Sequence, residues 1–487
     1  MDTIKDKHDV TDSIEQHGGL SEIKKIIGNA EEIDTVSNES NAPIKFNQTD
    51  AGNAELLIHL YGNIIRYNHT DRMWLKWNGD YWKSDEKIYI NELAKQSAKY
   101  RQEYALSIND TQKKRNEANF AFGSENQRRI LDCINSAKTI EKISTTAAEW
   151  NRDPLSLQCD NGLLILAENV EFVKGKPEFM ISKSTRIKYD ANEECPLWKK
   201  TIQEIFSNDV EMAQYFQRCV GYSLTGVTSE QKFFLLFGTG ANGKSVIFEI
   251  LGDILGDYAI NTRFDTFERK YNKQSNEIAR LHGYRLVTAN ESGDTKKLDS
   301  ELIKAITGGD KVTGRFLYHE SFDFSPQLKL WLASNSLPTV TDTSHGFWRR
   351  VQIIELQEKF MGNNADLDLV QKLKSELPGI LNWALEGFRQ YTMFGLNPPN
   401  KVNNAVDKYR TDSDIVAKFV EECIEEVKDE IILAKYLYEY FAKWYEENYA
   451  GKPITQIIFG KRMGSIGYKS EKIGGKKKYT GVKIIHE

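Results

Sequence analysis

The chain has 487 residues, which is too long for one hydrophobic core and predicts two to four domains. Its 65 Lys and Arg against 70 Asp and Glu give a net charge of −5, so the overall charge does not mark a nucleic-acid-binding protein. Five widely spaced cysteines without a C-x-x-C pair argue against a zinc ribbon or a disulfide framework. Without a run of about 18 apolar residues, we expect a soluble cytoplasmic protein with no membrane contact.

The first 45 residues contain no aromatic side chain, and the first 40 hold ten acidic residues against four Lys. Because such a segment can bury little apolar surface, residues 1–45 are predicted to form a flexible acidic arm. An α+β domain is expected over residues 46–195. In it, Thr49 is a predicted helix N-cap, and Asn78-Gly79 is a predicted hairpin turn.

The most specific motif of the chain fits the phosphate-loop pattern G-x-x-x-x-G-K-[ST]. An apolar run of strand length, 233–237, precedes it, and residues 246–255 have apolar side chains at helical spacing. A strand, a glycine loop and a helix in this order aim backbone N–H groups at one anionic site. The residues expected to hold the nucleotide are Gly238, Thr239, Gly240, Ala241, Asn242, Gly243, Lys244 and Ser245.

The chemistry of this loop predicts ATP and Mg²⁺ as cofactors. Lys244 is expected to reach the β- and γ-phosphates, and the hydroxyl of Ser245 is expected to bind Mg²⁺. The alternative is a glycine turn that binds nothing, but the full pattern with matching flanks favours a nucleotide site.

Two predicted strands further along end in polar residues that suit ATP hydrolysis. The strand 284–289 leads to Glu291, a carboxylate that can orient or deprotonate the attacking water and help to hold Mg²⁺. The strand 328–333 leads to Asn335, an amide that can sense the γ-phosphate. The alternatives are an ordinary surface Glu and a polar turn.

Between and after these strands lie two further candidate elements. Residues 316–324 are expected to pair as a hairpin with its tip near Tyr318, and basic and aromatic side chains there can follow a nucleic-acid backbone. Arg349 and Arg350 precede an apolar strand, and we interpret this pair as a source of an arginine finger for a neighbouring subunit. A structural ion pair is the alternative.

A charged stretch over 401–413 is predicted to be a linker to a C-terminal domain, 414–487. Predicted helices over 414–427, 433–444 and 455–466, followed by two strands around a glycine pair, indicate a winged helix. Residues 461–483 hold eight Lys and Arg against one Glu, which is typical of a duplex-binding surface rather than a basic tail without a partner. Its predicted DNA-binding residues are Lys461, Arg462, Lys476 and Lys477.

Taken together, these motifs resemble the superfamily 3 helicases, and more closely the phage/plasmid primase–helicase family that includes poxvirus members. The matching segments cover about residues 46–485 and include Trp77-Asn-Gly79-Asp-Tyr-Trp82, Asp160-Asn161-Gly162, Cys195-Pro196-Leu-Trp198, Gly221-Tyr222-Ser-Leu224-Thr225-Gly226, the phosphate loop, Ala279-Arg-Leu281-His-Gly283-Tyr-Arg285, Thr307-Gly308-Gly309-Asp310, Ser334-Asn335 and Trp348-Arg349-Arg350.

The resemblance implies an α/β fold with an AAA+-like P-loop ATPase core over 196–400. It also implies a ring-shaped homo-oligomer, a hexamer, that translocates 3′ to 5′ on single-stranded DNA. By the same resemblance, Lys244, Ser245, Glu291 and Asn335 act in cis, and Arg350 acts in trans. The hairpin segment 308–324 matches the element that contacts DNA in the ring channel, and its candidate residues are Lys311, Arg315 and His319.

The sequence departs from this family pattern at two places. Asn290 precedes a single acid, Glu291, where many relatives have two, so the division between metal contact and general base stays open. Only about 45 residues precede the shared region, too few for a primase domain, so a separate primase is the expected partner.

The leading hypothesis is an ATP-dependent helicase or replication initiator of a phage, plasmid or other mobile element, acting on single-stranded and forked DNA and on origin duplex. A non-helicase ring ATPase for packaging, remodelling or defence is the alternative. A small-molecule kinase is disfavoured, because it needs neither an arginine finger nor a terminal DNA-binding domain.

Overall fold

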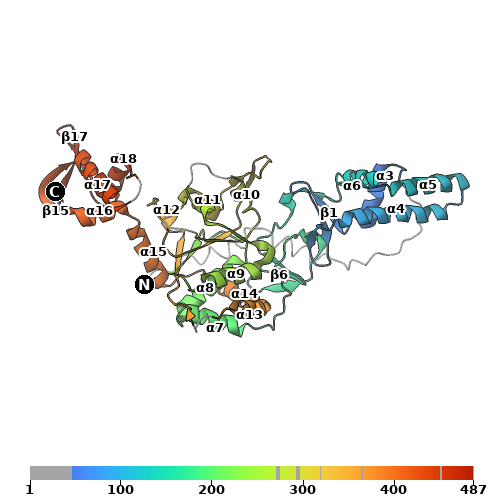
Figure 1. Cartoon of the computed structure of the whole chain (residues 1–487), viewed down its shortest axis with the longest axis horizontal. Coiled ribbons are helices and arrows are strands. Elements are labelled where there is room, and N and C mark those ends of the chain that lie inside the picture. The colour runs from blue at the N-terminus through green and yellow to red at the C-terminus, as the bar shows by residue number, and fades with distance from the viewer. Residues whose placement is uncertain are drawn as a thin grey trace.

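The computed structural model describes residues 46–269, 275–291, 297–318, 320–362, 366–449 and 452–485. The predicted acidic arm and His319 lie outside these residues. Three units follow one another along the long axis of the molecule, with a helical N-terminal unit at one end, a central sheet covered by helices, and a small C-terminal unit at the other end (Figure 1). Among the described helices, we find none with the length and apolar character needed to cross a bilayer.

The N-terminal unit combines a helical bundle with two small sheets. The predicted N-cap is confirmed, because the Thr49 hydroxyl accepts a hydrogen bond from the amide of Gly52 at 3.0 Å. The predicted hairpin turn at Asn78-Gly79 is also confirmed. The elements are α3 (Asp50–Tyr61), β1 (Ile65–Asn68), β2 (Met73–Trp77), β3 (Trp82–Ser84), α4 (Tyr89–Ser107), α5 (Thr111–Ser124), α6 (Gln127–Ala137), β4 (Ser144–Thr145), β5 (Ser156–Cys159), β6 (Gly162–Ile165) and β7 (Glu171–Val173). The two sheets have the orders β3-β2-β1-β4 and β5-β6-β7.

The central unit is built on a five-stranded parallel sheet with the order β14-β8-β13-β10-β9. Its strands are β8 (Phe233–Phe237), β9 (Ala259–Arg263), β10 (Leu286–Asn290), β13 (Lys329–Ser334) and β14 (Val351–Glu355). Because all five strands are parallel, their carboxyl ends lie at one edge of the sheet, where ligands bind in open α/β sheets. The chain is therefore a mixed α/β protein with a parallel sheet.

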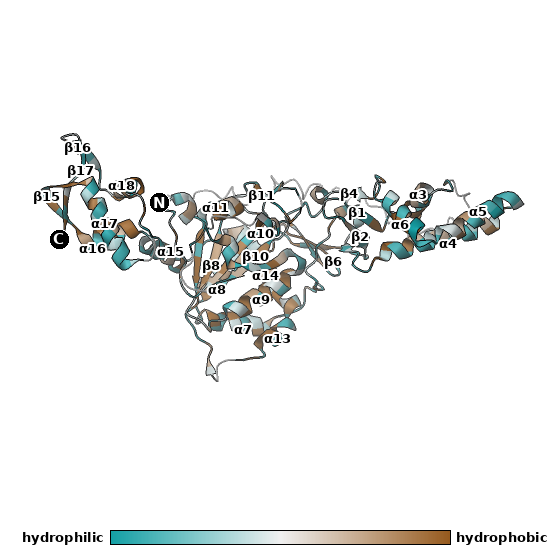
Figure 2. Cartoon of the chain, turned by 45° about the horizontal axis from the view of Figure 1, so that its top comes forward, coloured by the Kyte–Doolittle hydropathy of each residue, from teal (hydrophilic) through white to brown (hydrophobic). Residues whose placement is uncertain are grey.

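Helices cover both faces of this sheet, and alternate side chains of each strand enter two cores (Figure 2). Phe234 and Leu236 of β8 join the core under α7 (Pro196–Ile205), α8 (Val210–Ser223), α9 (Lys244–Leu255) and α14 (Leu377–Phe394). Phe233 and Leu235 join the core on the opposite face, under α11 (Ser300–Gly308) and α12 (His345–Trp348). The short helices α10 (Ser275–Ala279) and α13 (Leu369–Lys374) complete the unit. Burial on both faces explains why the sheet strands are continuous apolar runs.

The hairpin of the central unit differs from the predicted one. Its strands are β11 (Val312–Gly314) and β12 (Phe322–Phe324), paired antiparallel, so a pairing that starts at Phe316 is wrong. Val312 and Phe324 are opposite each other and are both buried in the core, which places the paired part at the base of the hairpin. Residues 315–318 and 320–321 belong to the connection between the strands.

The C-terminal unit also corrects one predicted element. Helix α16 (Ile415–Cys423) stops before Val427, and the chain continues as β15 (Ile424–Leu433), because Ile424 and Ile432 pair with Ile484 and Tyr479 of the last strand. The other elements are α17 (Ala434–Asn448), α18 (Gln456–Ser465), β16 (Ser470–Ile473) and β17 (Lys476–Ile484), with the sheet order β15-β17-β16. The stretch predicted as a linker forms α15 (Asn400–Asp412), which packs against β14.

Candidate nucleotide site and nucleic-acid interface

The loop from Gly238 to Gly243 joins the buried strand β8 to the amino terminus of α9. Gly240 and Gly243 have φ values of +103° and +83°, which L-residues with a Cβ rarely adopt. These conformations turn the loop around the amino end of α9, where backbone N–H groups have no partner within the helix. A loop of this conformation before a helix is suited to binding an anion.

Lys244 is the first residue of α9 and folds back over the loop. Its Nζ donates to the carbonyl of Gly238 at 2.5 Å. Partial burial lowers the pKa of Lys244, and the negative charge of Glu291 opposes this shift, so the two side chains influence each other electrostatically. Ser245 is the next residue and is exposed beside it.

A segment that was not predicted from the sequence forms hydrogen bonds with the loop. After β14, the amide of Phe360 donates to the carbonyl of Ala241 at 2.8 Å, and Nδ2 of Asn242 donates to the carbonyl of Glu358. The Glu358 carboxylate in turn accepts from the hydroxyl of Ser207 at 2.6 Å. We call residues 356–361 the loop strap. The feature of the sequence that could have indicated this contact is Asn242, because its side-chain amide can donate a hydrogen bond to a backbone carbonyl.

Glu291 follows β10 and lies beside the end of β13. Its backbone amide donates to the carbonyl of Ala333 at 2.9 Å. Its carboxylate accepts hydrogen bonds from the Ser334 hydroxyl and from the backbone N–H of Asn335, the latter at 3.2 Å. The predicted pair Glu291 and Asn335 is therefore brought together, and the contribution of the serine hydroxyl was not foreseen from the sequence.

The two arginines before β14 point in different directions. Arg350 is only 8% exposed, and it donates from Nε to the Thr307 hydroxyl at 3.2 Å and from Nη1 to the carbonyl of Gly346. Burial lowers the pKa of Arg350, as does the neighbouring charge of Arg349, while Asp310 opposes the shift. Arg349 is exposed and contacts Gln231. Within this chain, Arg350 therefore ties the carboxyl end of α11 to α12, and Arg349 faces solvent.

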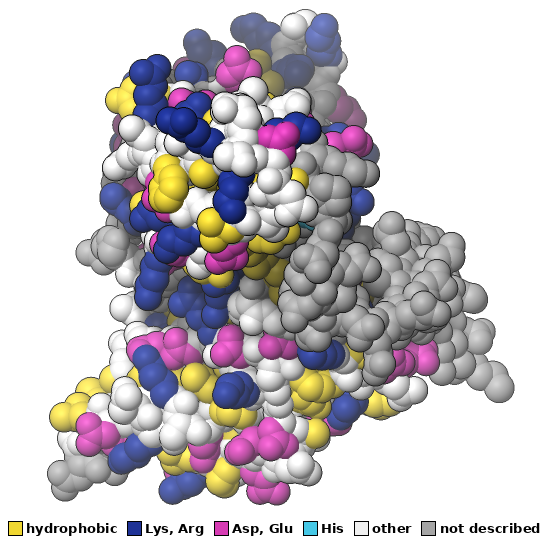
Figure 3. Space-filling model, turned by 90° about the vertical axis from the view of Figure 1, so that its right-hand side faces the viewer, with side chains coloured by type: hydrophobic (Ala, Val, Ile, Leu, Met, Phe, Trp, Pro, Cys, Tyr) yellow, Lys and Arg dark blue, Asp and Glu magenta, His cyan; other side chains and the backbone are white. Residues whose placement is uncertain are grey.

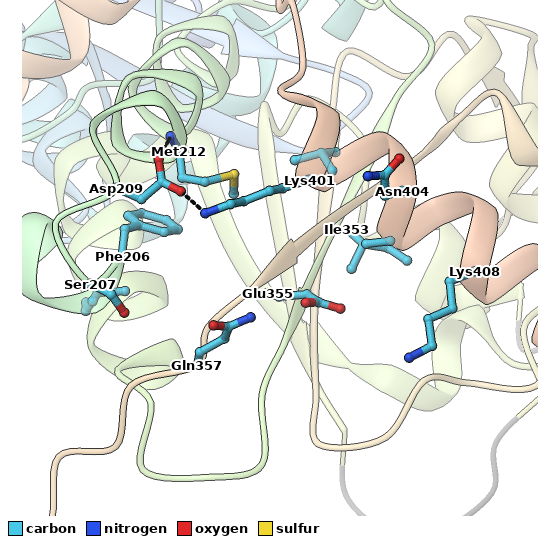
Figure 4. Close-up of a pocket in the computed structure, with 13 residues that line it drawn as sticks. Phe206, Ser207, Asp209, Met212, Ile353, Glu355, Gln357, Lys401, Asn404 and Lys408 are labelled. Atoms are coloured by element: carbon cyan, nitrogen blue, oxygen red, sulfur yellow. Dashed lines mark hydrogen bonds and ion pairs between the residues drawn. The ribbon is translucent and has the colours of Figure 1, made fainter.

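A pocket of about 430 Å³ lies near the phosphate loop, although none of the loop residues lines it (Figure 4). Ile205 connects the two, because it lines the pocket and a Cβ on Gly243 would lie 2.9 Å from its Cδ1. The pocket lies between the α7–α8 turn, β14 and α15, and an ion pair between Asp209 and Lys401 crosses its upper side. Glu355, Gln357, Asn404 and Lys408 supply further polar groups.

The predicted nucleic-acid residues fall into two places. Lys311 and Arg315 are exposed at the two ends of β11, while His319 lies outside the described residues. In the C-terminal unit, Lys461 is exposed on α18, and Lys476 and Lys477 are exposed on the β16–β17 hairpin.

Arg462 is more constrained than its neighbours, because its Nη2 pairs with the carboxylate of Asp414 at the start of α16. In the β16–β17 hairpin, Lys472 is directly opposite Lys477, an arrangement that is unfavourable without an anion nearby. By contrast, basic side chains on the face drawn in Figure 3 are interspersed with acidic and apolar ones.

Comparisons with known proteins match three stretches of the chain to described families. Residues 54–207 match "D5 N terminal like", residues 236–350 match a family of unknown function (DUF5906), and residues 411–483 match "Poxvirus D5 protein-like". The chain therefore carries D5-like primase–helicase domains. These matches lie in its N-terminal and its C-terminal unit.

Curated proteins similar to this chain come from large DNA viruses. A protein of Acanthamoeba polyphaga mimivirus named "Putative helicase L207/L206" is 30% identical over 318 residues, covering 60% of this chain and 33% of the relative. "Putative helicase 121R" of Invertebrate iridescent virus 3 is 26% identical over 484 residues, covering 84% of this chain and 51% of the relative. The chain thus spans a third to a half of the length of these relatives.

A solved structure, the apo C-terminal region of NrS-1 (305–718), aligns with 88% of this chain and 99% of its own length. It has 12% sequence identity and a TM-score of 0.46.

Proposed function

We propose that the chain is an ATP-dependent, ring-forming DNA helicase or replication initiator of a virus, phage, plasmid or other mobile element. The observation that carries this proposal is the convergence of the phosphate loop, Glu291 and Asn335 at one edge of a parallel sheet. The names of the viral relatives, which include helicases and an African swine fever virus protein named "Putative primase C962R", support a role in replication.

The donor groups present fit Mg²⁺ and a nucleoside triphosphate. Hard oxygen donors, the Ser245 hydroxyl and the Glu291 carboxylate, suit Mg²⁺, which neutralises phosphate charge when bound. Lys244 would exchange its contact with the Gly238 carbonyl for phosphate oxygens. Glu291, held by Ser334 and the Asn335 amide, would orient the attacking water and accept its proton.

We place the nucleoside part of ATP in the pocket beside the loop. Ile205 lies against Gly243 and also lines the pocket, so the pocket is close to the loop that we propose to hold the phosphates. Apolar walls from Ile205, Phe206 and Met212 suit a planar base, and the polar groups along β14 can bind its edge.

The proposal includes an AAA+-like P-loop core and a ring of subunits. The strand order β14-β8-β13-β10-β9 supports the AAA+-like core. In this order the phosphate loop follows β8, which is the neighbour of the edge strand β14. Arg350 is the proposed finger in trans. Its contact with Thr307 in the last turn of α11, the helix that precedes the β11–β12 hairpin, supports a coupling between a neighbour's γ-phosphate and this hairpin.

The C-terminal unit is proposed to be a winged helix that binds origin duplex. Its order of helix, strand, two helices and a two-stranded hairpin supports this assignment, and the hairpin carries the lysines of the predicted wing. Forked and single-stranded DNA would bind the central unit, and 3′-to-5′ translocation is part of the proposal.

The competing proposal is a DNA-dependent ring ATPase without helicase activity. The test compares ATP hydrolysis with and without single-stranded DNA, and the opening of a forked duplex, for the wild type and for Lys244→Ala. Stimulation by DNA together with fork opening supports the helicase. Stimulation without fork opening supports the alternative.

A further inference from the structure

Three consecutive large apolar side chains stand at the tip of the β11–β12 hairpin. Phe316 is 37% exposed, Leu317 is 69% exposed and Tyr318 is 99% exposed. A run of exposed apolar residues is unfavourable on a soluble surface unless it serves a function. The tip of this hairpin is thus a candidate contact surface.

The backbone of Tyr318 is held in a conformation that a tyrosine rarely adopts. Its φ is +62°, in the left-handed region that favours glycine, asparagine and aspartate. Strained backbone of this kind is typical of positions where a side chain is presented to a ligand. Here it accompanies a ring that is almost fully exposed to solvent.

The tip rests on a column of aromatic rings. Phe316 stacks on Phe322 with ring centroids 5.5 Å apart and an interplanar angle of 21°. Phe322 lies 5.7 Å from Phe324, and the ring of His282 lies 5.1 Å from Phe324. Because Phe324 is buried in the core, this column anchors the exposed tip to the central unit.

The base of the hairpin has little freedom to move relative to α10. A Cβ on Gly314 would lie 2.7 Å from the Cα of Ala279, so the two backbones are in close contact. Helix α10 leads into β10, whose end carries Glu291. Figure 2 shows β11 beside α10 and above the sheet. The hairpin is therefore packed against the segment of chain that leads to the proposed catalytic carboxylate.

We propose that Tyr318, with Leu317 beside it, stacks on an unpaired base of single-stranded DNA. This inference rests on the proposed function, and it adds a base contact to the backbone contacts proposed for Lys311 and Arg315. Each base offers a π-face, so stacking on a tyrosine tolerates every sequence. The exposed Lys311 at the foot of the hairpin supplies charge complementarity to the phosphates on either side of that base.

The experiment measures the affinity of the full chain, with a non-hydrolysable ATP analogue, for two oligonucleotides of equal length across a salt series. One is oligothymidylate, and the other carries abasic sites in its central positions. We expect the wild type to bind the first more tightly. Tyr318→Ala should weaken binding to oligothymidylate roughly 5- to 100-fold, leave the abasic oligonucleotide unaffected and keep the same salt slope.

Two variants serve as controls. Tyr318→Phe keeps the ring and should bind as the wild type does. Phe122→Ala removes an aromatic side chain that is 64% exposed on α5, far from the hairpin, and should change neither affinity. Tyr318→Gly should behave as Tyr318→Ala does, since it relaxes the backbone but also lacks the ring.

Equal affinity of the wild type and Tyr318→Ala for oligothymidylate would overturn the inference. Dissociation of the oligomer by Tyr318→Ala would overturn it as well, because the tip would then contact another subunit. A wild type that bound neither oligonucleotide at any salt concentration would contradict the proposed function itself. A wild type that bound both oligonucleotides equally would contradict only the base contact.

Discussion

The backbone amide of Asn335 donates to the carboxylate of Glu291 at 3.2 Å, which joins the ends of the neighbouring strands β13 and β10. The Ser334 hydroxyl donates to the same carboxylate oxygen. Two donors from one strand therefore hold a carboxylate that follows another strand. This arrangement fixes the direction of the carboxylate relative to the phosphate loop after β8.

Glu291→Gln is expected to bind ATP normally and to hydrolyse it roughly 10²- to 10⁴-fold more slowly, because a carboxamide cannot accept the proton of the attacking water. Nucleotide affinity and turnover are measured on the same preparation. Loss of ATP binding would instead identify Glu291 mainly as a metal contact. Ser336→Ala is a matched control, since its hydroxyl lies 3.4 Å from the same carboxylate and it should retain most activity.

Lys244→Ala is expected to abolish ATP hydrolysis and fork opening without unfolding the chain. Among the residues that the structure describes, its Nζ hydrogen-bonds to the Gly238 carbonyl alone, so we expect little loss of stability, whereas the bound phosphates lose a point charge. Turnover and the thermal midpoint of unfolding are the measurements. Normal turnover would contradict the nucleotide site.

Arg350→Ala is expected to retain ATP binding and to lose about 10³-fold in hydrolysis, and mixing it with Lys244→Ala subunits should restore part of the activity. Restoration occurs when an intact loop meets an intact finger in one ring. Arg349→Ala is the control for the exposed neighbour. Rescue for Arg349→Ala and none for Arg350→Ala would assign the trans role to Arg349 and leave Arg350 as the brace of Thr307.

Asn404→Trp is expected to raise KM for ATP several-fold with little change in kcat. Asn404 is an exposed residue of α15 that lines the pocket, and an indole there would occupy space proposed for the nucleoside. Steady-state kinetics over a range of ATP concentrations provide the test. Lys418→Trp on α16 is a control on an outlying helix, and an unchanged KM for Asn404→Trp would exclude the pocket as the nucleoside site.

Removal of residues 414–487 is expected to leave ATP hydrolysis largely intact and to weaken duplex binding sharply. Each phosphate contact that is lost should reduce the logarithmic salt slope by roughly 0.9. Affinities for origin and random duplex are compared across a salt series, and the double variant Lys476→Ala/Lys477→Ala should give a smaller change in the same direction. Equal slopes for all three proteins would show that this unit binds another partner, such as a separate primase.

The sequence alone predicts those parts of the structure whose signals are local. The strand, loop and helix around Lys244 follow from glycine spacing and apolar periodicity, and the Thr49 cap and the Asn78-Gly79 turn follow from side-chain chemistry. The polar ends of β10 and β13 were predicted because parallel strands end at one edge.

The missed features depend on contacts between distant segments. Strand β15 replaces the end of a predicted helix because Ile424 and Ile432 pair with residues about fifty positions away. The loop strap depends on Asn242 reaching the carbonyl of Glu358. The burial of Arg350 is accompanied by its hydrogen bond to Thr307, and this contact between distant residues cannot be predicted from the local sequence.

The central claim is tested most directly by the opening of forked DNA under ATP turnover. Forks with a single 3′ tail or a single 5′ tail are compared for the wild type, with Lys244→Ala as the inactive control. We expect the wild type to open the fork with the 3′ tail and its ATP hydrolysis to be stimulated by single-stranded DNA. Lys244→Ala should neither open a fork nor hydrolyse ATP with or without DNA. A wild type that hydrolyses ATP at the same rate with and without DNA and opens neither fork would contradict it.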